Sequence, residues 1–446
     1  MKTTRRIFLK DSGLAVVSVG IAPALGPLFL RSAAYAQEPV RLSSKTGGKK
    51  TLVCIFQRGA VDGMSMVVPH GDPYYYQHRI VGPGGIGIAN TGPDGVIDLD
   101  GKFGLHPSLA PLKPIYDAGH LAAVQACGSP NATRSHFDAQ DYMESAAPGD
   151  KAISTGWLTR ALQCCPEDRT KLRSLFQGVA MTGYVPRSFQ GDPHALAIPD
   201  FRTFGLTANA RPKRPRWNAP DAGMIGDDVA AAFREMYDSD SGDVLHGTGK
   251  DMFEAIRVVR QLNKVRYMPE NGARYPGTAY GRALMQIAQL VKSNLGLEVG
   301  FAELGGWDTH VRQGGAQGQL SNRLREFSQG LSAFYTDLGD RMADVAVLTM
   351  SEFGRTARQN GNGGTDHGHA TCFFAMGGEI NGGKVLGEWP GLAPEQLNEN
   401  RDLAVTTDFR DVFGELAQRH LGVARLAAVF PGYEESAAKF RGVVRA

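Results

Sequence analysis

One stretch in the C-terminal third of the chain gathers residue types that bind metal ions. The apolar run 345–350 is typical of a buried strand, and Glu352 follows it closely. After a loop rich in glycine and asparagine, Asp366, His367 and His369 stand within four residues of one another. Carboxylates and imidazoles are suitable ligands for hard to borderline divalent ions. Because open α/β sheets place their sites at the carboxyl ends of strands, we predict a metal site here.

Two other predicted strands end in similar residues. Asp62 follows the buried run 51–56 and is close to glycines, which let the backbone approach a ligand. Taken by itself, Asp62 is better explained as a turn residue before glycine. Asp308 and His310 stand two residues apart after the predicted strand 297–304. If these strands run parallel in one sheet, their carboxyl ends share an edge and the side chains can converge.

A fourth strand end leads into a helix that could bind an anion. The run 121–127 predicts a buried strand, and a helix is predicted to begin near Ser135. The Ser135 hydroxyl is either an N-cap that accepts from the Asp138 amide or a nucleophile at an anion site. A helix N-terminus supports both interpretations, because it offers free N–H groups and positive potential. Arg134 and His136 favour an oxyanion such as phosphate or sulfate, and the residues alone leave the choice open.

The order of the elements indicates how these groups are brought together. Predicted strands alternate with amphipathic helices, and the longest helix has an apolar face that extends from Leu320 to Met342. This order is typical of a doubly wound α/β fold. We therefore predict three layers, with a mainly parallel sheet between helices. Residues 206–280 are a candidate helical cap inserted into this single domain.

The N-terminus has the features of an export signal. Arg5 and Arg6 form a twin-arginine pair, an apolar region follows, and Ala34 and Ala36 are suitable for cleavage before Gln37. A membrane anchor is the less favoured alternative, because the apolar region is short and contains glycine and proline. We expect residues 1–36 to direct export to the periplasm or beyond, with no stable membrane insertion after cleavage.

The composition argues against a nucleic-acid partner. The formal net charge of +3 falls to about −1 when the leader's five basic residues and one acidic residue are left out. A chain so nearly neutral does not suggest nucleic acid or a membrane surface. The basic, proline-rich run 211–216 is short and lacks interleaved aromatic residues, so we interpret it as a solvated loop. We expect a small-molecule or polymer substrate instead.

Five motifs mark the predicted strand ends. They are Arg58–Gly63, Arg134–Gln140, Gly306–His310, Ser351–Thr356 and Thr365–His369. With the twin-arginine leader they resemble the exported bacterial family known as the domain of unknown function 1501, over essentially the whole mature chain. That family is grouped with the alkaline phosphatase and sulfatase superfamily. The resemblance implies an alkaline phosphatase-like fold, in which a mainly parallel sheet lies between helices with metals at the strand ends.

The resemblance also implies roles for particular residues. Asp62 matches the superfamily's first metal-binding aspartate. Ser135 occupies the place of the nucleophile at a helix start, with Thr133 as a rival. Asp308 and His310 resemble an acid–histidine metal pair, although the superfamily usually spaces such a pair more widely.

One position departs from the superfamily's pattern. After the strand 345–350 the pattern has an aspartate and a histidine, but Phe353 stands where the histidine would be. Asp366 and His367 come later and would have to fold back to replace that pair. The departure leaves open whether there is a second metal ion and ordinary phosphatase activity.

These observations lead to one preferred hypothesis, an exported metal-dependent hydrolase of phosphate or sulfate esters. It would hold one or two divalent ions such as Zn, Mn or Ca, and two ions about 4 Å apart can clamp the attacking and leaving oxygens. Ser135 would be the nucleophile or anion anchor, Arg134 and His136 oxyanion partners, and Glu352 a ligand or a base behind the ligands. The predicted metal ligands are Asp62, Asp308, His310, Asp366, His367 and His369. The alternative is a non-catalytic binding or assembly protein with the same fold.

Overall fold

A nine-stranded sheet lies at the centre of the part of the chain that the computed structural model describes, residues 49–164, 174–192, 195–205, 244–434 and 436–445. Its strand order is β11-β5-β10-β9-β1-β8-β6-β7, and β12 pairs with β5. The strands are β1 (Thr51–Arg58), β5 (Leu121–Gly128), β6 (Gly178–Ala180), β7 (Leu196–Ala197), β8 (Val299–Gly305), β9 (Val345–Met350), β10 (Thr371–Gly377), β11 (Lys384–Leu386) and β12 (Thr407–Asp408).

Every strand pair in this sheet is parallel except those that involve β10. β1 pairs in parallel with both β8 and β9, and β5 pairs in parallel with β11. β10 lies between β5 and β9 and is antiparallel to both. The carboxyl ends of β1, β5, β8 and β9 therefore share one edge, as predicted, and β10 begins at that same edge.

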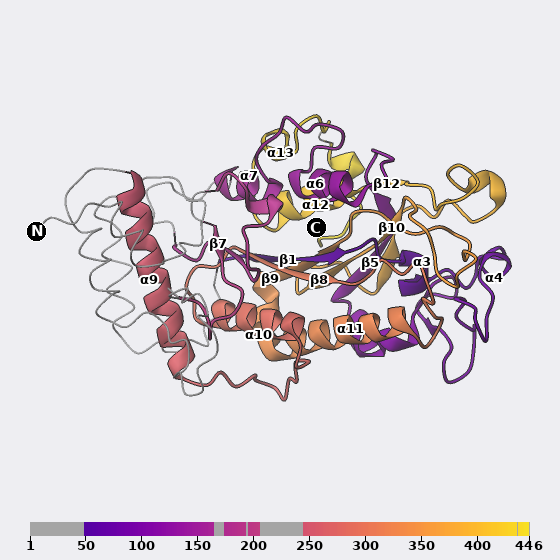
Figure 1. Cartoon of the computed structure of the whole chain (residues 1–446), viewed down its shortest axis with the longest axis horizontal. Coiled ribbons are helices and arrows are strands. Elements are labelled where there is room, and N and C mark those ends of the chain that lie inside the picture. Colours follow the sequence, from indigo (N-terminus) through magenta and orange to yellow (C-terminus); the bar gives the residue numbers. More distant parts are fainter. Residues whose placement is uncertain (1–48, 165–173, 193–194, 206–243, 435, 446) are drawn as a thin grey trace, which may run out of the picture.

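Helices cover both faces of the sheet and make a molecule of three layers (Figure 1). One face carries α5 (Lys113–Asp117), α10 (Ala279–Lys292) and α11 (Gln319–Leu338). The other carries α6 (His136–Ser145), α7 (Trp157–Cys164), α12 (Phe409–Arg419) and α13 (Leu426–Val429). The predicted fold class, a mainly parallel sheet between two layers of helices, is confirmed.

Smaller elements complete the described chain. The short helices are α3 (Gly63–Met66) and α4 (Tyr75–His78), and α9 (Val244–Lys264) is a longer one. A second sheet joins β2 (Val67–Val68), β4 (Gly104–Leu105) and β3 (Ile97–Asp98). Turns of 3-10 helix occur at Pro107–Leu112, Arg187–Phe189, Gly339–Asp344, Pro394–Gln396 and Ala437–Lys439.

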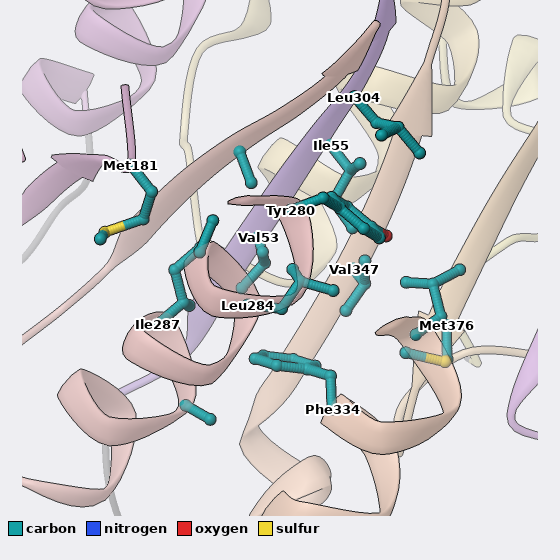
Figure 2. Packing of buried hydrophobic residues seen from close by; sticks show 14 of the residues in the cluster. Val53, Ile55, Met181, Tyr280, Leu284, Ile287, Leu304, Phe334, Val347 and Met376 are labelled. Atoms are coloured by element: carbon teal, nitrogen blue, oxygen red, sulfur yellow. The ribbon is translucent and has the colours of Figure 1, made fainter. Parts of the chain in front are cut away.

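The alternation of side chains along β1 explains why both faces are covered. Val53 and Ile55 point to one face, where they join the core with α10 and α11 (Figure 2). Leu52, Cys54 and Phe56 belong to the core on the other face. All five are fully buried. Burying an aliphatic or aromatic side chain contributes about 1.5–3 kcal/mol, so leaving either face exposed would be costly.

Two predictions from the sequence fall partly or wholly outside the described residues. The leader, residues 1–36, is outside them, and so are residues 206–243 of the candidate cap. The described part of the cap includes α9, which lies at the opposite end of the molecule from α3 (Figure 1). Among the helices described here, none is both long and apolar enough to cross a membrane.

Candidate metal centre

Side chains from three separate parts of the chain meet at the edge where β1, β5, β8 and β9 end. His136 opens α6 after β5, and Asp308 and His310 follow β8. His367 lies in the connection 351–370 between β9 and β10. Because β10 is antiparallel to β9, this connection leaves the edge and returns to it, and His367 comes back to where β9 ended. Of the pair Asp366 and His367, the returning connection brings His367 into this group, while Asp366 lies on the far side of His310.

The metal-binding atoms of these four side chains are in close contact. The Nε2 atom of His367 lies 3.0 Å from Nε2 of His136 and 3.0 Å from Nε2 of His310. Asp308 Oδ1 lies 2.9 Å from His310 Nε2 and 3.2 Å from His367 Nε2, while Oδ2 is 3.5 Å from His136 Nε2. Donor atoms of His136, Asp308 and His367 all lie within 4.8 Å of one another, and His310 borders this group.

The protonation of His367 follows from its other ring nitrogen. Its Nδ1 atom is 2.9 Å from the main-chain carbonyl oxygen of Arg134, which can only accept a hydrogen bond. Nδ1 therefore carries the proton, and in the neutral ring Nε2 has a lone pair. Burial lowers the pKa of His367, which favours this neutral form. The lone pair points at two other imidazole nitrogens and a carboxylate.

The other two histidines are held in the same way by carboxylates. His136 Nδ1 donates to Glu352 Oε1 at 2.8 Å, and His310 Nδ1 donates to Asp366 Oδ1 at 3.0 Å. A histidine that binds a metal normally donates its second N–H to such a partner, which fixes the tautomer and the ring orientation. Three Nε2 lone pairs facing each other repel unless a proton or a cation lies among them. The arrangement is thus typical of a metal site.

Glu352 is buried behind His136, and its carboxylate has several hydrogen-bond donors. It accepts hydrogen bonds from His136, from Gln140 Nε2 at 2.8 Å and from the Gly59 amide at 2.8 Å. Burial alone would raise the pKa of Glu352, but the bonds from His136 and Gln140 lower it overall. The hydrogen bond to Glu352 in turn raises the pKa of His136. Glu352 is therefore a carboxylate that orients the His136 ring.

Arg355 orients the acidic ligand. Its guanidinium is fully buried and donates to Asp308 Oδ1 at 2.6 Å, and it also binds the hydroxyl and the carbonyl oxygen of Thr365. Burial would raise the pKa of Asp308, but the bond from Arg355 lowers it overall, so the carboxylate stays ionised. The sequence had assigned Arg355 no role. Its place in the Ser351–Thr356 motif was the one available signal.

Phe353 packs against two of the ligands. Its ring centroid lies 4.9 Å from that of His136 and 5.0 Å from that of His367, and the side chain is buried. This is the position at which the superfamily pattern has a histidine. Here Phe353 forms an apolar wall against the two imidazole rings, and the returning connection contributes the imidazole of His367.

Gly59 allows the backbone to pass close to the acidic ligand. Its φ of +117° is rarely adopted by residues with a side chain, and an added Cβ would lie 2.9 Å from the Asp308 amide nitrogen. The next residue, Ala60, also has a positive φ of 62°. The end of β1 is thus bent so that the Gly59 amide reaches Glu352.

Ser135 and Arg134 occupy different environments. Ser135 is the N-cap residue of α6, but its hydroxyl makes no capping hydrogen bond and the residue is exposed. The predicted bond to the Asp138 amide is therefore not formed, and the hydroxyl is free to face a ligand. The Arg134 guanidinium instead binds Glu399 at 2.8 Å and Asp402 at 2.5 Å.

Asp62 is not brought into this group. Its carboxylate is fully buried and forms a two-point ion pair with Arg79, with distances of 2.7 and 2.9 Å. Gln313 donates to it at 2.6 Å and Ser65 at 2.8 Å. Burial would raise the pKa of Asp62, but the Arg79 charge lowers it overall. These bonds give Asp62 the character of a structural anion in a buried network.

The remaining predicted ligands lie around the group. Asp366 contacts His310 Nδ1 and Asn360, and its half-exposed carboxylate supports His310 from outside. The His369 ring points elsewhere, and its Nε2 bonds to the Ser129 carbonyl oxygen at 2.9 Å. Of the six predicted ligands, the structure thus gathers Asp308, His310 and His367. It adds His136, which the sequence had predicted to bind an oxyanion.

The spacing of several donor pairs is close to that around one tetrahedral ion. Ligands about 2.0–2.1 Å from a tetrahedral zinc ion lie about 3.3 Å from one another. The contacts of His367 with His136 and His310, and those of Asp308 with the three histidines, are 2.9–3.5 Å, although Asp308 meets His136 through Oδ2 and the other two through Oδ1. Three imidazoles and one carboxylate suit zinc or a similar ion better than calcium, which takes about six to eight oxygen ligands. In the described ranges, this is the one cluster with three mutually close donors.

Comparison with known proteins identifies a family but no activity. The family model described as "Protein of unknown function (DUF1501)" matches residues 49–430. No curated protein matches. The structural comparison found the crystal structure of PsFucS1 sulfatase from Pseudoalteromonas sp., with 12% identity and a TM-score of 0.39. The matched region covers 98% of this chain and 81% of that chain.

Proposed function

We propose that this chain, which belongs to the DUF1501 family, is an exported metal-dependent hydrolase of phosphate or sulfate esters. One divalent ion would be held by His136, Asp308, His310 and His367. The observation that supports this most strongly is the convergence of three Nε2 atoms on Asp308, while each Nδ1 atom is held by an acceptor.

The chemistry follows from what surrounds these ligands. A bound ion would polarise the ester oxygen and lower the pKa of a bound water or hydroxyl. Asp308 is partly exposed, so an ester can reach the site from solvent. The free Ser135 hydroxyl precedes His136 at the N-terminus of α6, where unpaired N–H groups favour an anion. Ser135 is therefore our candidate for the nucleophile, while Glu352 and Arg355 hold the ligands in place.

Elemental analysis of the purified protein tests the metal site. We expect about one ion per chain, as in a site with a single set of protein ligands. His367→Ala should lose that ion, whereas His120→Ala, at the opposite end of β5, should keep it. A wild-type protein without stoichiometric metal would contradict the proposal.

Turnover of generic aryl phosphates, phosphodiesters and aryl sulfates tests the activity. Ser135→Ala should retain the ion and lose turnover, which separates a nucleophile from a ligand. Stoichiometric metal without turnover across this panel would support the alternative of a non-catalytic binding protein.

Export is a separate part of the proposal and rests on the leader. Replacing Arg5 and Arg6 by lysine should leave the protein in the cytoplasmic fraction, since the twin-arginine pair is the recognised signal. Immunoblots of cell fractions measure this. A periplasmic double variant would show that another route is used.

A further inference from the structure

A pocket of about 600 Å³ is lined by loops that adjoin two of the candidate metal ligands in sequence, His310 and His367. Its volume is in the range of sites that bind small molecules, about 300–1,000 Å³. Its lining comes from three loops, within residues 81–94, 312–317 and 362–363.

The same loops build the pocket and the metal centre. Arg312 is two residues beyond His310, so their Cα atoms are at most about 7.6 Å apart. Asn362 and Gly363 belong to the connection that carries His367. The neighbouring Gly364 is so close to His310 that an added Cβ would lie 2.3 Å from its carbonyl carbon. The loops that carry His310 and His367 therefore also form part of the pocket wall.

Hydrogen bonds and close backbone contacts hold the walls of the pocket in position. Gln359 donates to the Gly84 carbonyl oxygen at 2.8 Å and accepts from the Ile86 amide at 3.1 Å. His106 bonds to the Gly315 carbonyl oxygen at 3.1 Å. An added Cβ on Gly315 would lie 2.9 Å from the Gly87 carbonyl oxygen, so two of the loops touch. Because seven of the lining residues are glycines, the main chain forms much of the surface.

The polar groups of the pocket favour an anion at one end. The Arg312 side chain is exposed, with no hydrogen bond or ion pair to any residue that the structure describes. Within those residues, the main-chain amides from Gly314 to Gln317 also have no hydrogen-bond acceptor. A guanidinium near successive free amides is a typical arrangement for binding carboxylate, sulfate or phosphate. Asp94 also lines the pocket, and its exposed carboxylate repels an anion that binds close to it.

We propose that this pocket binds a second anionic group of the substrate through Arg312, while the ester to be hydrolysed lies at the metal centre. The proposal rests on the proposed function and narrows it. The substrate class becomes esters of phosphate or sulfate that carry a further carboxylate, sulfate or phosphate on the part retained after hydrolysis. A simple aryl ester would occupy the metal centre alone and bind more weakly.

Calorimetric binding of unhydrolysable probes tests this assignment. Straight-chain phosphonates that end in a carboxylate are compared with alkylphosphonates of the same length, over a series of spacer lengths. We expect one spacer length to bind about tenfold tighter than its uncharged match, since a hydrogen bond to a charged group is stronger than one to a neutral group. Arg312→Gln should abolish this gain and Arg312→Lys should retain part of it. Asp94→Asn should increase the gain.

Two results would overturn the proposal: no gain at any spacer length, or a full gain in Arg312→Gln. Arg312 has a φ of +49°, but glutamine shares this backbone requirement, so the substitution changes charge without adding strain. Failure of the proposed function gives a different result, in which the alkylphosphonates bind equally with and without added zinc. The comparison between paired probes still tests the pocket in that case.

Discussion

At the scale of single residues, the candidate metal centre is defined by the groups that hold its three histidines. His367 is oriented by a main-chain carbonyl oxygen, and His136 and His310 are oriented by carboxylates. The two carboxylates differ in environment, because Glu352 is buried and Asp366 is half-exposed. Solvent competes for the exposed hydrogen bond and screens its charge, so the two should not contribute equally.

Replacing these carboxylates separately tests that difference. Glu352→Gln should weaken metal affinity about 10- to 100-fold, which is typical for partners of metal-bound histidines. Asp366→Asn should weaken it less, because its bond to His310 is open to water. Competition with a chromogenic chelator measures both constants. A larger loss of metal affinity in Asp366→Asn than in Glu352→Gln would show that burial does not determine how much each carboxylate contributes.

A second residue-scale prediction concerns acid stability and Asp62. Its pKa is lower in the folded protein than in the unfolded chain, so the ion pair with Arg79 stabilises the fold above the ordinary value of about 3.9. This contribution is lost as the pH falls through the lowered folded value. Asp62→Asn should cost about 3–5 kcal/mol at pH 7, because Arg79 would be left buried and unpaired.

Urea unfolding at neutral and acidic pH measures this effect. The wild type should lose more stability on acidification than Asp62→Asn, which lacks the titrating group. The control is Asp117→Asn, which removes an exposed carboxylate and should be close to neutral. Equal acid sensitivity of the wild type and Asp62→Asn would contradict the expectation.

The sequence could indicate most residues of the centre but not all their roles. Asp308, His310 and His367 were recognised because acids and histidines followed buried strands. His136 was assigned to an oxyanion, since nothing local shows that α6 starts beside the end of β8. Asp62 was expected at the metal because a partner 17 residues away, Arg79, leaves no local pattern. Roles that depend on distant partners follow from the tertiary structure.

At the scale of elements, the direction of β10 decides which residues reach the site. The sequence predicted each of the four strands that end at the site edge, because buried runs between glycines and helices are distinctive. It did not indicate that β10 would be antiparallel, since strand direction depends on pairing across the sheet. A parallel β10 would require the chain to cross to the opposite edge first. The antiparallel connection returns directly and keeps His367 beside His136, His310 and Asp308.

Gly59 provides the element-scale prediction. Gly59→Ala should destabilise the protein by more than the 1–2 kcal/mol or so expected for a left-handed residue, because the new Cβ meets the Asp308 amide. Displacement of Asp308 should also lower the metal content. Gly183→Ala is the matched control, since no atom lies within 4 Å of its added Cβ. Thermal unfolding and elemental analysis measure the stability and metal content of both variants. Equal losses in Gly59→Ala and Gly183→Ala would argue against a constrained strand end.

At the scale of the whole molecule, the centre joins segments that are far apart in sequence. His136 follows β5, Asp308 and His310 follow β8, and His367 precedes β10. These strands are not all neighbours, because β9 and β1 lie between β10 and β8. An ion bound to all four ligands would therefore connect both halves of the sheet edge. Its effect on stability should involve the whole fold.

Metal removal tests that connection. A ligand that binds only the folded state stabilises it by about 2.7 kcal/mol at 100 times its dissociation constant. Dialysis against a chelator should therefore lower the midpoint of thermal unfolding, and added zinc should restore it. His367→Ala should start from the lower midpoint and show no response to zinc. An unchanged midpoint in the wild type would mean that the ion does not hold these segments together.

The antiparallel return of the chain into β10 has a further consequence, for the rates of folding and unfolding. The three histidines and Asp308 come from three connections, which follow β5, follow β8 and precede β10. They therefore meet only after β5, β8, β9 and β10 have assembled. Interactions that form after the transition state slow unfolding and leave the folding rate nearly unchanged. An ion bound here would then have little effect on the folding rate. It would instead lengthen the lifetime of the folded protein by slowing its unfolding.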